Sequence, residues 1–184
     1  MGSVALKSFV NVPTELTSLS EAELVRATKS VVATETAATT NVVRHLVEIF
    51  KRRTFAVLSY SSMSKFAREE LGYDKASAQR RVNAMFLAMD VPEVLEMIEA
   101  KTLHLQVAAD IQTFLNKERG ARRPYSNDEK FALVQRCARR STRQVQRYLA
   151  SLNPACDFRD SKRYVSKDRL QVTHTLSVEV EDKL

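Results

Sequence analysis

Hydrophobic residues recur at steps of three, four and seven between positions 24 and 50, within a stretch that contains neither glycine nor proline. This spacing is typical of an amphipathic α-helix. Ser20 supplies a capping hydroxyl ahead of Glu21 and Glu23, whose charges suit a helix N-terminus. The pattern therefore predicts one long helix over residues 19–58, preceded by an N-terminal arm at 1–18 that we expect to be flexible.

Shorter amphipathic segments follow, and most of them open with a residue suited to a helix start. These residues are Ser62, Asp74, Pro92, Ser126, and Ser141 or Thr142. Gly72 suits the end of the first segment, because glycine tolerates a positive φ. The predicted helices span residues 62–71, 75–89, 92–100, 105–117, 128–139 and 143–152.

The C-terminal residues follow a different pattern. Residues 169–178 alternate between hydrophobic and polar side chains, which predicts a single β-strand after a basic loop that begins at residue 154. Three glycines and four prolines are too few for the many tight turns of a sandwich or barrel. The expected fold is all-α, with the long N-terminal helix, a multi-helix bundle over residues 59–153 and a single C-terminal strand.

Positive charge is concentrated in one part of the chain. The net charge is +7, and residues 119–169 alone contain fourteen Lys and Arg but five Asp and Glu. Such an excess favours a polyanionic partner. The alternative is a solvated charged face. The candidate phosphate contacts are Arg122, Arg123, Arg136, Arg139, Arg140, Arg143 and Arg147.

The segment 62–89 has the order of a helix-turn-helix: a short helix, a turn with Gly72, and a second helix capped by Asp74. Its second helix is expected to turn Ala78, Val82, Met85, Phe86 and Met89 inward. Its other positions carry side chains that can contact base edges. These candidates for base reading are Lys75, Ser77, Gln79, Arg80, Arg81 and Asn83. The alternative is an ordinary helical hairpin.

Signals for catalysis are absent from the sequence. Cys137 and Cys156 match no metal spacing, and Cys137 fits a buried helical position. His45 has Glu48 at helical ligand spacing but no further ligand, and His174 falls on the hydrophobic side of the predicted strand. We therefore expect no enzyme, metal, cofactor or small-molecule substrate, and no cleavage of DNA.

The remaining expectations concern location and assembly. No apolar run is long enough to cross a bilayer and no signal peptide is evident, so a cytoplasmic, nucleoid-associated location without membrane contact is expected. A helix as long as 19–58 exceeds what a small domain covers, and a lone strand leaves its edges unpaired. Both features favour a homodimer, whose interface is expected to bury the hydrophobic residues along 31–50 of the long helix.

Several segments together resemble a known family. The run from Tyr60 to Tyr73, the segment Ala78–Ala84, the segment from Pro92 to Leu105 and the tail from Val165 to Glu179 resemble the region upstream of bacterial HNH endonuclease domains. Residues 60–105 are also similar, more weakly, to the helix-turn-helix of ParB-type partition proteins. The resemblance implies a DNA-targeting or assembly module and carries over no catalytic residue, because the His-Asn-His motif is not present.

The sequence thus predicts a non-catalytic module that binds double-stranded DNA. Two alternatives stay open. One is a helical scaffold for protein interaction or oligomerisation, and the other is the N-terminal part of a longer HNH endonuclease.

Overall fold

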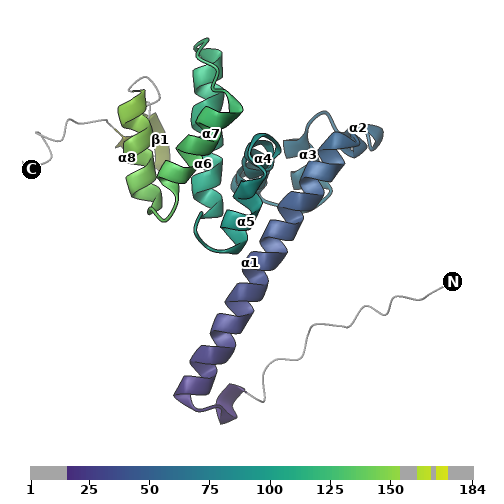
Figure 1. Cartoon of the computed structure of the whole chain (residues 1–184), viewed down its shortest axis with the longest axis vertical. Helices are drawn as coiled ribbons and strands as arrows, with labels where there is room; N and C mark the ends of the chain where they lie inside the picture. Colours follow the sequence, from purple (N-terminus) through teal and green to yellow (C-terminus); the bar gives the residue numbers. More distant parts are fainter. Residues whose placement is uncertain (1–15, 154–160, 167–168, 174–184) are drawn as a thin grey trace, which may run out of the picture.

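The computed structural model of this chain describes residues 16–153, 161–166 and 169–173 (Figure 1). Residues 16–153 are entirely helical outside their turns. A 3₁₀ turn, η1 (Leu16–Ser18), precedes α1 (Glu21–Lys51), α2 (Thr54–Val57), α3 (Met63–Glu69), α4 (Lys75–Asp90), α5 (Glu93–Glu99), α6 (Leu105–Gly120), α7 (Asn127–Cys137) and α8 (Thr142–Leu152). Among these helices, none is both long enough and apolar enough to traverse a membrane.

The predicted long helix is present but ends earlier than expected. Ser20 and Glu23 form a capping box at the start of α1, and the helix runs to Lys51. There Arg53 adopts a left-handed conformation with φ 57°, which separates α1 from the short α2. The prediction of one helix to residue 58 is therefore wrong, because a non-glycine residue interrupts the helical backbone.

The start sites of the shorter helices are confirmed. Side chains of Ser62, Asp74, Ser126 and Ser141 each accept a hydrogen bond from the first turn of α3, α4, α7 and α8 respectively. Gly72 lies in the turn between α3 and α4 with φ 72°. That these two helices form a DNA-reading helix-turn-helix stays a prediction.

Helix α4 is the centre of the bundle and packs against α1, α3, α5 and α6. Ala78, Val82 and Met85 are buried as predicted, whereas Phe86 and Met89 are only partly buried. Further buried residues lie on its other sides: Ala84, Leu87 and Ala88. The prediction that α4 buries one hydrophobic side is thus incomplete, because neighbouring helices cover α4 on several sides.

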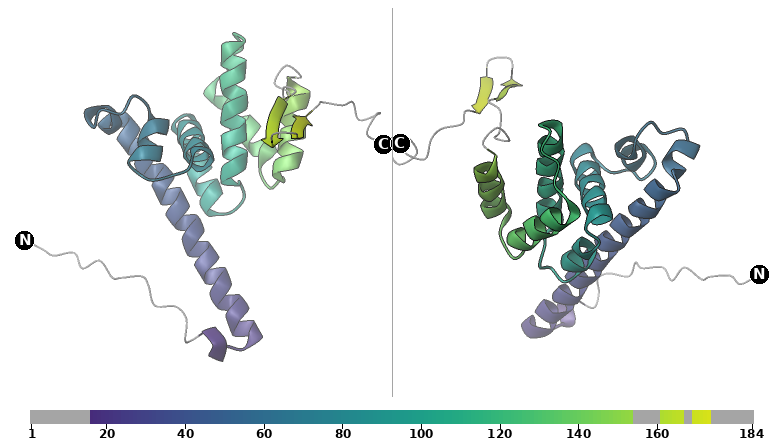
Figure 2. Two further views of the ribbon diagram at one scale, coloured as in Figure 1. Left: turned by 180° about the vertical axis from the view of Figure 1, so that it is seen from behind. Right: turned by 45° about the horizontal axis from the view of Figure 1, so that its top comes forward.

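Only the C-terminal half of α1 belongs to this bundle. Its buried residues are Thr40, Val43 and Leu46, and an ion pair of 2.7 Å between Arg44 and Glu99 ties it to α5. The N-terminal half projects away from the other helices (Figure 1 and Figure 2). The expectation that the bundle cannot cover the whole long helix is met.

Helices α4, α6 and α8 lie in that order and run in the same direction (Figure 2). Ser77 and Leu105, near the starts of α4 and α6, line one cleft, and Asp90 and Asn116, near their ends, line another. Gln146 of α8 donates a hydrogen bond of 3.0 Å to Asp110 of α6. About two turns further along both helices, the side chain of Asn153 donates a hydrogen bond to Glu118. The N-termini of all three helices therefore lie at the same end of the bundle.

Beyond α8 the described residues form a two-stranded antiparallel hairpin of β1 (Ser161–Ser166) and β2 (Arg169–Thr173). The single strand predicted over residues 169–178 is not confirmed. Residues 169–173 are paired with a preceding strand that was expected to be loop, and residues 174–178 lie outside the described part. The prediction of a lone strand with two unpaired edges is thus corrected for residues 169–173, because β2 is paired with β1. The strand therefore no longer supports a dimer.

Candidate nucleic-acid interface

Basic side chains gather at the end of the bundle where α4, α6 and α8 begin. This surface, called the basic end below, consists of Lys75, Arg80, Arg81, Lys101, His104, Arg139, Arg140 and Arg143. A backbone hydrogen bond of 2.7 Å from Arg139 to the carbonyl of Thr102 joins the α7–α8 turn to the α5–α6 loop. Each helix N-terminus adds a partial positive charge, so the three termini and the basic side chains all attract anions to this end of the bundle.

A cleft of about 460 Å³ opens on one side of the basic end. Arg80, Arg81 and Lys101 line it from the bundle, and Glu35 lies on the opposite wall formed by α1. His104, the residue before α6, also lines the cleft and makes no side-chain cap to the helix that it precedes. The first turn of α6 therefore adds partial positive charge to a cleft that already contains three cationic side chains.

Asn83 cannot read a base edge from its position in this fold. The residue is only 8% exposed, between α4 and α6. Its amide nitrogen donates to the hydroxyl of Thr113 at 3.0 Å and to the carbonyl of Ala109 at 3.4 Å, and its oxygen accepts from Gln79 at 2.7 Å. The prediction for Asn83 is corrected: its hydrogen-bonding groups join α4 to α6.

The other base-reading candidates occupy the first half of α4. Lys75 and Gln79 are exposed, while Ser77, Arg80 and Arg81 are half-buried. Arg81 lies over the ring of Tyr73 at 4.2 Å and donates to the carbonyl of Ser77 at 3.2 Å. Arg80 donates to the Ser77 hydroxyl at 3.0 Å. The accessible candidates for base reading therefore lie in the first turns of α4.

Asp74 is an acidic residue beside these cations. Its carboxylate accepts hydrogen bonds from the backbone of Ala76 and Ser77, at 2.8 and 3.0 Å. Hydrogen bonding with Ser77, and more weakly the charge of Arg80, lowers the pKa of Asp74. The carboxylate is thus ionised at neutral pH and is occupied in capping α4.

The α7–α8 segment presents most of the predicted phosphate contacts. Arg139, Arg140, Arg143 and Arg147 are exposed in the turn and along α8. Arg139 adopts a left-handed backbone with φ 58°. No acidic residue lies between positions 131 and 153, so the chain itself places no counter-charge within this segment.

Tyr148 contacts two arginines, Arg140 of this turn and Arg136 of α7. The guanidinium of Arg140 lies 5.4 Å from the centre of its ring, and Arg136 donates to its hydroxyl at 3.4 Å. Stacking and hydrogen bonding restrict side chains that would otherwise be free to rotate. The ring of Tyr148 thus holds arginines from α7 and from the turn beside α8.

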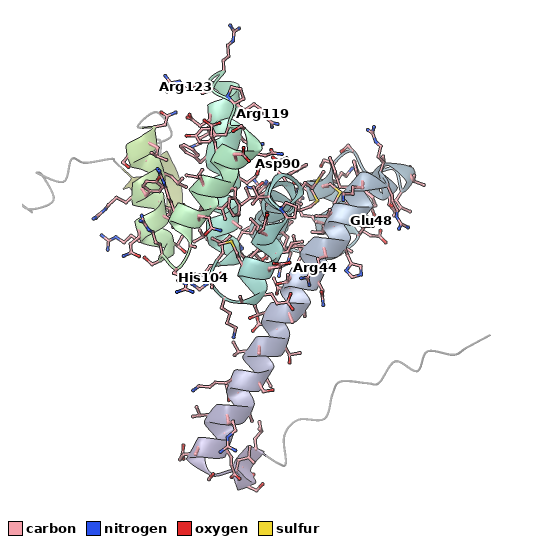
Figure 3. All side chains as sticks on the ribbon, viewed as in Figure 1. Arg44, Glu48, Asp90, His104, Arg119 and Arg123 are labelled. Carbon is pink, nitrogen blue, oxygen red and sulfur yellow. The ribbon has the colours of Figure 1, made fainter. Side chains whose placement is uncertain are left out.

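Arg122 and Arg123 lie apart from the other predicted phosphate contacts. They follow the C-terminal end of α6, whereas His104 precedes its first turn. Figure 3 shows His104 at one end of this helix and Arg119 and Arg123 at the other. A helix of this length separates the two groups by roughly 24 Å. The structure therefore divides the predicted phosphate contacts between opposite ends of α6.

The histidines and Cys137 do not form a metal site within the described residues. His45 contacts the carbonyl of Asn41 at 2.7 Å, and Glu48 is paired with Arg52 at 2.6 Å, so each of these two side chains has a partner of its own. Cys137 is buried, as predicted. Within residues 16–153, 161–166 and 169–173, no three His, Cys, Asp or Glu side chains are grouped to hold a metal ion.

Three residues of the interface were not among the sequence candidates: Lys101, His104 and Tyr148. Lys101 and His104 lie between helices, where helical periodicity gives no orientation. Tyr148 follows Arg140 by eight residues, a spacing that predicts no contact across a turn. Their proximity to the arginines depends on tertiary packing.

Comparison with known proteins gives no relative: no protein-family model, curated protein or solved structure matches this chain. The resemblance to the region upstream of HNH endonuclease domains, and the weaker one to ParB-type proteins, therefore stay predictions.

Proposed function

We propose that this chain is a non-catalytic module that binds double-stranded DNA through the basic end and the adjoining α8. One observation carries the proposal: three parallel helices begin at the same end, where exposed arginines of the α7–α8 turn and half-buried arginines of α4 lie near the helix N-termini. Helix N-termini and arginines are both good ligands for phosphate oxygens.

The shape of the charged surface supports a polymer rather than a single anion. Basic side chains continue from Arg80 in the cleft, through Lys101 and Arg139, to Arg147 on α8. With helix axes about 9 Å apart, the three helices span roughly 20 Å. This is the width of a DNA duplex rather than that of one phosphate group.

The test is a fluorescence-anisotropy titration of a random-sequence duplex at several salt concentrations between about 50 and 200 mM. Neutralising phosphates releases counterions, so the affinity of the wild type should fall on the order of 10²-fold over this range. Replacing Arg136, Arg139 and Arg140 with alanine should weaken binding and flatten the salt dependence by about two to three units of slope.

The matched control removes the same charge from the other end of α6. Replacing Arg119, Arg122 and Arg123 with alanine should leave the salt slope nearly unchanged. Equal losses in both triple variants would mean that net charge alone attracts DNA. Absence of binding by the wild type at about 50 mM salt would refute the proposed function.

A second candidate function, a helical interaction scaffold, is favoured by the projecting half of α1. Val25, Val31 and Val32 are exposed on it although they are hydrophobic. This feature is compatible with DNA binding, because it lies on a different element from α8. Light scattering of the wild type and of a Val31→Glu variant tests this candidate separately.

A further inference from the structure

Helix α8 is positioned differently from α4, although both follow a turn and begin with a side-chain cap. Helix α4 has neighbours on several sides, and its residues from Ala78 to Ala88 are mostly buried. Helix α8 packs mainly on α6 at the edge of the helical bundle (Figure 1 and Figure 2). A major groove about 12 Å wide admits an α-helix only if that helix protrudes from its domain.

The α7–α8 unit has the local geometry of a helix-turn-helix. Helix α7 ends at Cys137, four residues form the turn, and α8 begins at Thr142. Arg139 supplies the left-handed residue of the turn, and Ser141 with Gln144 forms a capping box at the start of α8. These features fix the direction in which α8 leaves the turn.

The inner side of α8 is held firmly. Val145 and Leu149 are buried in the core, Gln146 is hydrogen-bonded to Asp110, and Asn153 to Glu118. Arg143 and Arg147 are four residues apart, so they lie one above the other on the opposite, exposed side. A rigid helix thus presents two guanidinium groups in a row.

We propose that α8, rather than α4, enters the major groove and that Arg143 and Arg147 read guanines there. This inference rests on the proposed function. Arginine can donate two parallel hydrogen bonds to O6 and N7 of guanine. Positions four residues apart on a helix are separated by about 6 Å along its axis, close to two base-pair steps of about 3.4 Å. Arg136 and Arg140, held by Tyr148, then contact the flanking phosphates.

The experiment uses Arg-to-Lys variants, because lysine keeps the positive charge that attracts phosphate but cannot form the bidentate hydrogen bonds that arginine makes to guanine. A preferred duplex is first selected from a random library with the wild-type chain. Binding of the wild type, Arg143→Lys, Arg147→Lys, Arg80→Lys and Arg119→Lys is then measured on the selected duplex and on a scrambled one. Arg80→Lys tests the competing assignment of base reading to α4, and Arg119→Lys, at the opposite end of α6, is the matched control outside the proposed interface.

The selected duplex should contain guanines about two base pairs apart. Arg143→Lys and Arg147→Lys should each lower the ratio of selected to scrambled affinity by about 5- to 100-fold. Both α8 variants should still bind the scrambled duplex, because lysine keeps the positive charge, and this binding also shows that they are folded. Arg119→Lys should match the wild type on both duplexes, and Arg80→Lys should keep the wild-type ratio of selected to scrambled affinity.

Three results would overturn the inference in distinguishable ways. A ratio that falls with Arg80→Lys but not with the α8 variants would assign base reading to α4. Binding without any selected sequence would remove base reading while leaving the proposed function intact. No binding of the wild type to any duplex would refute both the inference and the proposed function.

Discussion

Asn83 and Arg143 show that the chemistry of a side chain does not determine what it contacts. Both can hydrogen-bond a base edge, and both lie on helices that follow a turn. Asn83 is covered by α6 and its groups are paired within the protein, whereas Arg143 is exposed at the edge of the bundle. Helical periodicity placed Asn83 on a polar face, but a second helix packs on that face.

The buried hydrogen bonds of Asn83 make it a structural residue. Asn83→Ala removes the partner of Thr113 and Gln79, so it should lower the free energy of unfolding by about 1–3 kcal/mol. Urea denaturation monitored by circular dichroism measures this loss. Lys75→Ala, an exposed change in the same helix, should stay within about 0.5 kcal/mol of the wild type. A stable Asn83→Ala protein with weakened DNA binding would contradict the structural role.

Burial of Cys137 should control the reactivity of its thiol. The residue is 1% exposed, and burial raises the pKa of its thiol to about 11. In a Cys156→Ser background, Cys137 should react with a thiol reagent at pH 8 orders of magnitude more slowly when folded than in urea, because little thiolate is present and access is blocked.

The pH dependence of this thiol has a definite sign. The folded pKa lies above the ordinary value of 9.0, so the unfolded thiol ionises first as pH rises. The contribution of Cys137 to stability is present below pH 9 and is lost between pH 9 and about 11. The difference in unfolding free energy between this protein and its Cys137→Ala variant should narrow over that interval, and a constant difference would contradict the raised pKa.

At the scale of elements, features set by neighbouring residues were predictable and features set by distant ones were not. Ser126 and Ser141 lie next to the backbone groups that they cap, so the starts of α7 and α8 follow from local sequence. The common direction of α4, α6 and α8 depends on contacts such as that of Gln146 with Asp110, 36 positions apart. The basic end was therefore not predictable, although all five of its arginines were among the sequence candidates.

The left-handed residues are the second kind of feature that local sequence did not reveal. Glycine at position 72 signals such a backbone, and its φ is 72°. Arg53 and Arg139 adopt the same region with side chains that disfavour it. Nothing in their residue type marks these turns, which is why α1 was expected to continue past Arg53.

Arg139 offers a way to separate stability from DNA binding. A left-handed backbone costs an ordinary residue roughly 1 kcal/mol that glycine avoids. Arg139→Gly should therefore keep or raise the unfolding free energy by up to about 1 kcal/mol, while reducing the salt slope of DNA binding by about one unit. Thermal denaturation and the anisotropy titration measure the two effects. Arg139→Val should instead destabilise the turn, since a β-branched residue fits this region poorly.

At the scale of the whole molecule, the projecting half of α1 is the feature that the bundle leaves unexplained. Residues 21–39 contain no buried side chain, and the segment is rich in valine and threonine. Thr28 and Thr36 bond back to the carbonyls of Leu24 and Val32 at 2.8 and 2.9 Å. A helix of this length and composition is marginally stable in water without a packing partner.

The sequence-based expectation of a dimer needs one revision in light of this arrangement. The interface was expected along residues 31–50, but Val43 and Leu46 are buried within their own bundle. Only the projecting half remains for a partner. A second copy of α1 is the simplest one, because two such helices can bury their exposed valines against each other.

We therefore predict that the chain self-associates through the projecting half of α1. Light scattering at tens of micromolar should give about twice the 20.9 kDa mass of one chain. Val31, 67% exposed, lies on the hydrophobic side of the helix, so Val31→Glu should return the protein to a monomer. Ala33→Glu, on the opposite side at 3.6 residues per turn, should leave the dimer intact.

A dimer carries two basic ends, so Val31→Glu should also weaken binding to a long duplex while leaving binding to a short one unchanged. A wild-type monomer at these concentrations, or equal effects of the two glutamates, would contradict pairing through α1.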